Sequence, residues 1–88
     1  MSDDAFELPI EDTLDLHAFQ PRDIPSVVDE YLAAAHAAGF REVRLVHGRG
    51  IGVQRARVQQ VLRDHPLVSS YADAPESRLG ATIVKLRL

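Results

Sequence analysis

The stretch VRLVHGRG at residues 43–50 carries the strongest indication of the fold. Val43 and Leu45 alternate in the period of a β-strand, and His47 ends the apolar run. Gly48 and Gly50 follow at once, and a helix-like segment begins near residue 53. Glycine-rich turns between a strand and a helix expose backbone N–H groups to anions. The stretch therefore predicts a strand–turn–helix unit with the geometry of a phosphate site.

A second stretch, TLDLH at residues 13–17, also ends an apolar alternation on a histidine. Leu14 and Leu16 would face one side of a strand, and Asp15 and His17 the other. Parallel strands collect ligands at their carboxyl ends. If the two strands are neighbours, His17 and His47 share one edge of the sheet.

The remaining pattern predicts a two-layer α/β sandwich with the order βαβαββ. Helices are expected from about residue 24 to 38, before Gly39, and from 53 to 65, before Pro66. Strands are expected at 13–17, 41–47, 67–72 and 81–88. Two strand–helix units imply a parallel pair of strands with right-handed crossovers, and both helices would then cover one face of a mixed four-stranded sheet.

Length and composition limit the class of protein. The 88 residues make one domain, and we expect an acidic arm at 1–12 before the domain at 13–88. The chain has no cysteine, which excludes a disulfide framework and a thiolate zinc site. The start has no signal-peptide pattern and no apolar run reaches membrane-spanning length, so we expect a cytoplasmic protein with no membrane partner.

Charge is distributed unevenly, although the net value is only −3. Residues 1–40 hold nine acidic side chains and one arginine, whereas residues 41–63 hold six arginines and one glutamate. A local basic patch can contact phosphate in an acidic chain. The alternative is an ordinary surface helix with solvated arginines.

The two histidine motifs suggest acid–base chemistry beside a phosphate site. Either histidine could donate or accept a proton near neutral pH. Asp15 could orient His17, stabilise its imidazolium or bind a divalent metal. Arg49 could grip phosphate with two hydrogen bonds. The alternative is that the glycines serve turn geometry and the histidines cap nearby backbone.

These motifs together resemble the Smr (small MutS-related) domain. The resemblance rests on LDLH at 14–17, AAA at 33–35 with Gly39, VRLVHGRG at 43–50 and GATIV at 80–84. It covers residues 13–88 and looks like a small stand-alone member, with no P-loop in the chain. The resemblance implies a fold similar to the C-terminal domain of translation initiation factor 3, and endonucleolytic nicking or cleavage of DNA or RNA.

By this resemblance, Asp15, His17 and His47 are the candidate catalytic residues. The candidate phosphate and nucleic-acid contacts are Gly48, Arg49, Gly50, Gly52, Arg44, Arg55 and Lys85. Mg²⁺ or Mn²⁺ is a possible cofactor, with Asp15 as its candidate ligand. The chain departs from the family at Ala18, where glycine is usual, and at Arg49, where lysine is usual.

Two other functions fit the same sequence. One is a non-catalytic nucleic-acid or ribosome-associated binding module that uses the same phosphate cradle. The other is a protein-interaction domain that uses the open face of the sheet. The sequence does not indicate an oligomeric state.

Overall fold

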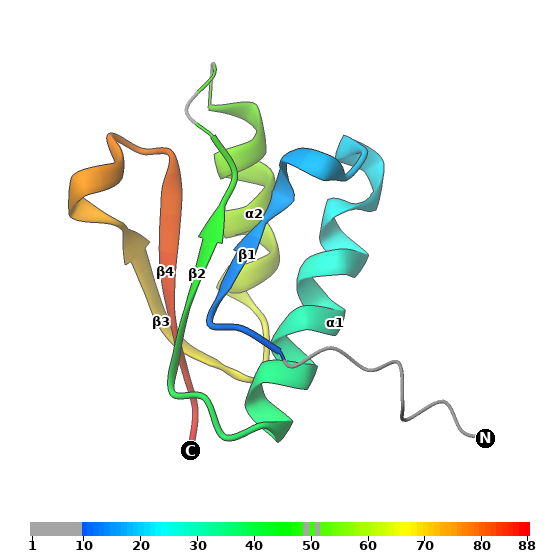
Figure 1. Ribbon diagram of the computed structural model, residues 1–88, viewed down its shortest axis with the longest axis vertical. Helices are drawn as coiled ribbons and strands as arrows, with labels where there is room; N and C mark the ends of the chain where they lie inside the picture. Colours follow the sequence, from blue (N-terminus) through cyan, green and yellow to red (C-terminus); the bar gives the residue numbers. More distant parts are fainter. Residues whose placement is uncertain (1–9, 49, 51) are drawn as a thin grey trace.

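The computed structural model describes residues 10–48, 50 and 52–88, and it has the predicted order of elements (Figure 1). Within these residues the chain forms β1 (Thr13–Asp15), α1 (Ile24–Ala37), β2 (Glu42–Val46), α2 (Val53–Arg63), β3 (Val68–Asp73) and β4 (Ala81–Leu86). Short 3-10 turns follow β1 (η2, Leu16–Ala18), precede α1 (η3, Pro21–Asp23) and follow β3 (η4, Pro75–Ser77). Residues 1–9 of the predicted acidic arm lie outside the described part of the chain.

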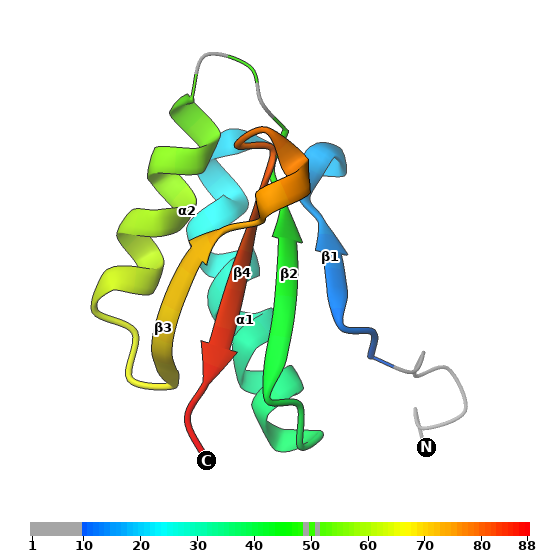
Figure 2. The ribbon, with the colours of Figure 1, turned by 90° about the vertical axis from the view of Figure 1, so that its left-hand side faces the viewer.

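The four strands form one mixed sheet in the order β1-β2-β4-β3. β1 pairs with β2 in parallel, and Asp15 lies opposite Val46 in this register. β4 pairs with β2 and β3 in antiparallel directions. Figure 2 shows both helices on the same face of the sheet, so the predicted two-layer arrangement is confirmed.

The core lies between the helices and the inner face of the sheet. Helix α1 buries Ile24, Val28, Leu32 and Ala35, which recur every three or four residues and so form one stripe. The sheet buries alternate positions, for example Val43 and Leu45 of β2, as a period of two requires. No helix in the described part of the chain is long and apolar enough to cross a membrane.

The end of β1 differs from the prediction in a way that matters for the site. The predicted strand ran to His17, but β1 ends at Asp15 and the chain enters turn η2. The Asp15 carboxylate accepts the backbone N–H of His17 at 2.9 Å and caps this turn. His17 therefore leaves the sheet at its edge instead of continuing the ladder.

The other ends of elements differ from the prediction by one or two residues. Helix α2 ends at Arg63 rather than 65, since Pro66 disfavours helical geometry in the residue before it. Strand β4 ends at Leu86 rather than 88, one residue past Lys85, which pairs with Glu42 at the start of β2. Gly39, with a φ of +90°, follows α1 as predicted.

Candidate nucleic-acid interface

The parallel pairing of β1 and β2 brings the two histidine motifs to one edge of the sheet. His17 lies two residues beyond Asp15, and His47 lies one residue beyond Val46, which is opposite Asp15. The imidazole of His17 lies against the backbone of Gly48, because a Cβ added to Gly48 would lie 2.9 Å from His17 Nε2. The expectation that the motifs share an edge is thus confirmed.

His17 and Asp15 form an exposed pair at this edge. His17 Nδ1 lies 2.6 Å from Asp15 Oδ1, and the two side chains are 62% and 65% exposed. The hydrogen bond from the His17 backbone N–H, and then the one from its side chain, lower the pKa of Asp15. An ionised carboxylate only accepts, so Nδ1 carries a proton and Nε2 faces Gly48.

His47 has different surroundings. It is only 6% exposed, and both of its ring nitrogens make hydrogen bonds. Nδ1 lies 3.0 Å from the carbonyl oxygen of Gly48, and Nε2 lies 2.9 Å from Thr82 Oγ1. His17 can therefore exchange a proton with a ligand as it lies, whereas His47 would first have to break one of its two hydrogen bonds.

Two open grooves meet at His17 and Gly48, which line both of them. The first, of about 380 Å³, runs toward the start of α2 and is also lined by His47, Gly50, Gly52, Val53 and Gln54. The second, of about 520 Å³, runs across the end of β2 and is also lined by Arg44, Val46, Glu76, Ser77, Gly80 and Ala81. An extended chain could therefore cross the site from one groove to the other.

The start of α2 is open to an anion. Gly52 precedes the helix with a φ of +87° and gives it no side-chain cap. The first N–H groups of a helix have no partner within the helix, and its dipole favours negative charge. Gly48 and Gly50 also have positive φ, at +83° and +40°. Arg49, the predicted phosphate ligand between them, lies outside the described residues.

The predicted basic contacts do not all lie at the site. Arg44 lines the second groove, where it pairs with Glu76 and lowers the pKa of that carboxyl. Arg55 binds Asp73 and lowers its pKa in turn. Lys85 pairs in register with Glu42, at the start of β2, and so lies at the opposite end of the strands from His47.

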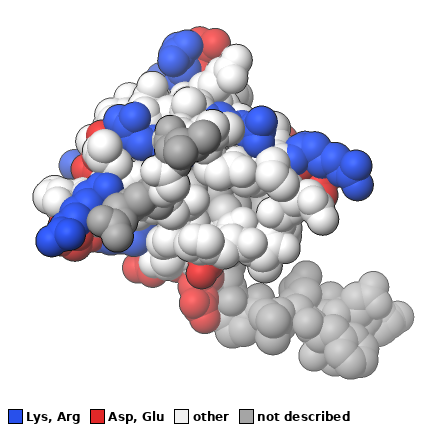
Figure 3. Space-filling model, turned by 90° about the horizontal axis from the view of Figure 1, so that it is seen from above, with Lys and Arg blue, Asp and Glu red and all other residues white. Residues whose placement is uncertain are grey.

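Figure 3 looks down on the end of the molecule where β1 and β2 finish. Lys and Arg side chains lie mainly around the rim of this view, and the centre that is not covered in grey is largely uncharged. Within the described ranges, no three His, Cys, Asp or Glu side chains gather into a metal-binding group. This end of the molecule therefore carries basic side chains mainly at its rim, while Asp15 and, in the second groove, Glu76 place carboxylates near His17.

Sequence reasoning missed three residues that link His47 to Arg55. Thr82 hydrogen-bonds to His47, and Gln59 and Asp73 continue the connection to Arg55. The sequence places Thr82 in the GATIV motif at 80–84, but nothing in that motif assigned it a role at the site. Its place on the inner side, in line with Val84 and Leu86, was the available signal, because a polar side chain among buried positions needs a partner.

A family profile described as the Smr domain matches residues 14–87. The chain is 45% identical over 62 residues to the endonuclease MutS2 of Caldicellulosiruptor saccharolyticus, an alignment that covers 68% of this chain and 8% of that protein. It is 36% identical over 83 residues to MutS2 of Caldicellulosiruptor bescii, covering 92% of this chain and 10% of that protein. The similarity to these relatives is thus confined to a small part of their length.

Two solved structures are similar over most of the chain. The Smr domain of Thermus thermophilus MutS2 superposes with a TM-score of 0.83 at 35% identity, covering 89% of this chain and all of that one (100%). YdaL, a stand-alone small MutS-related protein from Escherichia coli, superposes with a TM-score of 0.80 at 26% identity, covering 96% of this chain and 70% of that one.

Proposed function

Because the chain belongs to the Smr domain family, we propose that it binds nucleic acid and cleaves its phosphodiester bonds as an endonuclease. The observation that carries the proposal is the exposed His17–Asp15 pair, whose imidazole faces Gly48 where two grooves meet. The relatives named as endonucleases support the reaction class, but they share only 8% and 10% of their length with this alignment.

We assign phosphate binding to the backbone around the start of α2 and to nearby arginines. The N–H groups of the first turn of α2 have no side-chain cap among the described residues, and such groups suit the oxygens of a phosphodiester. Arg44 lies in the adjoining groove and would contact the next phosphate along the strand, in competition with Glu76. Arg49 keeps the phosphate role that its place between two glycines predicts.

We assign the proton transfer to His17. With its Nδ1 proton held by Asp15, neutral His17 presents Nε2 as a base. Nε2 would take the proton from water or from a ribose 2′-hydroxyl as that oxygen bonds to phosphorus. The bond from phosphorus to the leaving oxygen then breaks, and the imidazolium or solvent returns a proton to that oxygen. The burial of His47 favours a positioning role over the acid–base role that the sequence also allowed it.

Asp15 is also the residue that would hold Mg²⁺ or Mn²⁺. Its contacts with His17 use Oδ1, which leaves Oδ2 for a cation. One carboxylate together with substrate phosphate oxygens is a donor set that Mg²⁺ accepts. Such an ion would neutralise phosphate charge, and comparing Mg²⁺, Mn²⁺ and chelator tests whether it is needed.

The test is cleavage of supercoiled plasmid and of structured RNA by the purified protein, with divalent metal and with chelator. We expect His17→Ala to lower the cleavage rate by about 10²–10⁴-fold, the usual contribution of a positioned acid–base group. His36→Ala, at the far end of α1, is the matched histidine control and should cleave as the wild type does.

Cleavage that survives His17→Ala would remove this residue from the mechanism. Binding without cleavage on both substrates, under every metal condition, would favour the non-catalytic binding module. Absence of both binding and cleavage would contradict the proposal as a whole.

A further inference from the structure

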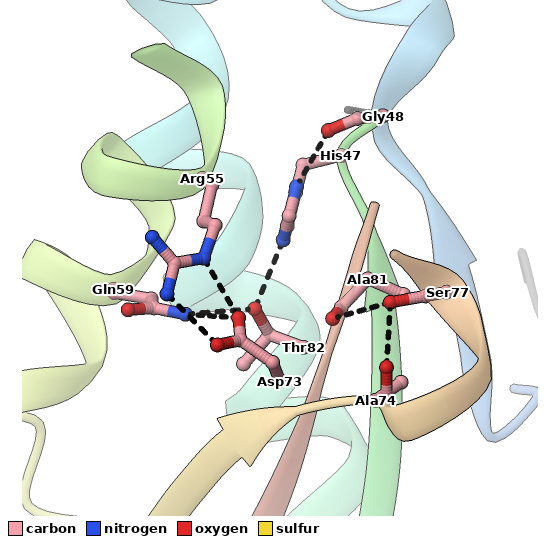
Figure 4. Close-up of polar contacts among 9 residues, drawn as sticks. All are labelled: His47, Gly48, Arg55, Gln59, Asp73, Ala74, Ser77, Ala81 and Thr82. Carbon is pink, nitrogen blue, oxygen red and sulfur yellow. Dashed lines mark hydrogen bonds and ion pairs between the residues drawn. The ribbon is translucent and has the colours of Figure 1, made fainter. Parts of the chain in front are cut away.

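We propose that Thr82, Gln59 and Asp73 are positioning residues, which hold His47 in one tautomer and so fix the Gly48 backbone beneath His17. Figure 4 shows these side chains as a connected row that runs from α2 through β3 and β4 to the end of β2. The effect on cleavage rests on the proposed function. The tautomer of His47 can be measured whether or not the protein cleaves nucleic acid.

The row begins at a fixed ion pair. Arg55 donates from Nε to Asp73 Oδ1 at 2.7 Å and from a terminal nitrogen to Oδ2 at 2.8 Å. This two-bond geometry fixes the plane of the carboxylate as well as its position. Asp73 therefore presents Oδ1 to α2 in one orientation.

Asp73 in turn determines which way the Gln59 amide points. Gln59 Nε2 lies 3.2 Å from Asp73 Oδ1 and 3.3 Å from Thr82 Oγ1. A carboxylate oxygen can only accept, so the amide NH₂ rather than the amide oxygen must face it. The second N–H of the same group then donates to Thr82.

The Thr82 hydroxyl determines which ring nitrogen of His47 acts as a hydrogen-bond acceptor. The side chain is fully buried, so its hydroxyl must find its partners within the protein. Its oxygen accepts from Gln59, and its hydrogen is left to donate to His47 Nε2 at 2.9 Å. Nε2 is thereby an acceptor and Nδ1 carries the proton.

The other end of the row requires the same tautomer. His47 Nδ1 faces the carbonyl oxygen of Gly48 at 3.0 Å, and a carbonyl accepts only. The N–H of Gly48 donates to the Gly80 carbonyl at 2.9 Å. Gly48 is thus held from both sides, and His17 Nε2 rests against it. Loss of the row would loosen the surface that orients His17.

The first experiment compares Thr82→Val with Thr82→Ser by ¹⁵N NMR of the histidine side chains, assigned with His17→Ala and His47→Ala. We expect the wild type and Thr82→Ser to show His47 as the Nδ1–H tautomer. Thr82→Val keeps the branched shape but removes the hydroxyl, so the tautomer preference should weaken. Ser69→Ala removes another sheet hydroxyl, which donates to the Lys85 carbonyl, and should leave His47 unchanged.

The second experiment measures single-turnover cleavage and nucleic-acid affinity on the same substrate. We expect Thr82→Val to slow cleavage by about tenfold to a hundredfold, as small misplacements of reacting groups do, and to change affinity much less. Thr82→Ser should restore the rate. A merely structural role would predict a lower melting temperature with no rescue of this kind.

Gln59→Met serves if Thr82→Val does not fold, since Gln59 is only partly buried and methionine keeps its length. It should weaken the tautomer preference and slow cleavage in the same direction. Unchanged His47 shifts in a folded variant would overturn the inference, as would altered shifts with an unchanged cleavage rate. If the wild type does not cleave, the proposed function fails while the NMR result still decides the tautomer.

Discussion

The two histidine motifs look alike in sequence and differ sharply in the structure. His17 leaves β1 in an exposed turn and pairs with Asp15, two residues earlier. His47 continues the end of β2 into the protein, where its partners are Gly48 and Thr82, the latter 35 residues away. One imidazole is therefore exposed where the two grooves meet, and the other hydrogen-bonds to the backbone against which the first one lies.

This difference shows how a chain can use one residue type for two purposes. The His17 side chain is largely exposed, whereas burial with two hydrogen bonds uses the whole capacity of the His47 ring. Substitutions should therefore separate activity from stability at the two positions.

The largest expected effect is that substitution of His17 lowers activity while substitution of His47 lowers stability. His17→Ala should abolish most cleavage yet change the free energy of unfolding by less than about 0.5 kcal/mol, as exposed substitutions do. His47→Ala should cost about 1–3 kcal/mol, because it removes the side-chain donor to the Gly48 carbonyl and leaves the buried Thr82 hydroxyl hydrogen without its acceptor. Urea unfolding and cleavage assays on both variants test it; equal stability losses would contradict the contrast.

Gly48→Ala links the two histidines and should have the next largest effect. The methyl group would meet His17 Nε2 at 2.9 Å, and the backbone φ of +83° adds strain of about 1–2 kcal/mol for a residue with a Cβ. We expect lower stability and lower cleavage. Gly39→Ala is the matched control, because its φ is +90° but nothing lies within 4 Å.

Gly39→Ala should therefore lose comparable stability and keep its cleavage rate. If Gly48→Ala and Gly39→Ala behave alike in both assays, the close approach of His17 to Gly48 does not contribute to cleavage.

A smaller effect is expected from the basic residues at the two ends of the strands. Arg44→Ala should reduce the slope of log affinity against log salt by about one, if Arg44 contacts one phosphate. Lys85→Ala, at the opposite end, should leave the slope unchanged. Arg49→Ala tests the phosphate role predicted from sequence in the same assay. A lower slope in Lys85→Ala would extend the binding surface beyond the histidine edge.

The smallest effect concerns the ion pair that anchors His47. Arg55 lowers the pKa of Asp73, so the folded state binds fewer protons there than the unfolded chain in acid. The resulting stability is present above about pH 4, the ordinary range of the carboxyl, and is lost as pH falls below it. Asp73→Asn should thus be less stable than the wild type at pH 7, with the difference shrinking in acid. A difference that stays constant with pH, as expected for Ser69→Ala, would contradict this.

Much of the fold could be predicted because its signals are local. The stripe of Val28, Leu32 and Ala35 and the alternation of Val43 and Leu45 follow from the geometry of a single helix or strand. The parallel pairing of β1 and β2 follows from the helix that joins them, because a strand–helix–strand connection returns the chain in the same direction. The end of β1 was misplaced because the Asp15 side chain offers the His17 N–H an alternative partner.

The candidate site was predicted less completely, because its pairings join distant parts of the chain. The basic segment at 41–63 loses part of its free charge to acids outside it, since Arg55 binds Asp73 and Arg44 pairs with Glu76. Lys85 shares the sign of a phosphate ligand but lies at the other end of the sheet. Charge counted along the sequence does not show these partners.

By itself, the sequence determined the order of elements and the placing of both histidines at the carboxyl ends of two parallel strands. These properties depend on residues that are close along the chain, through periodicity, turn chemistry and chain direction. Only the tertiary structure decided that His17 is exposed and that His47 is buried against Thr82. Burial and hydrogen-bond partners are set by packing between β2, β4 and α2, which no local pattern encodes.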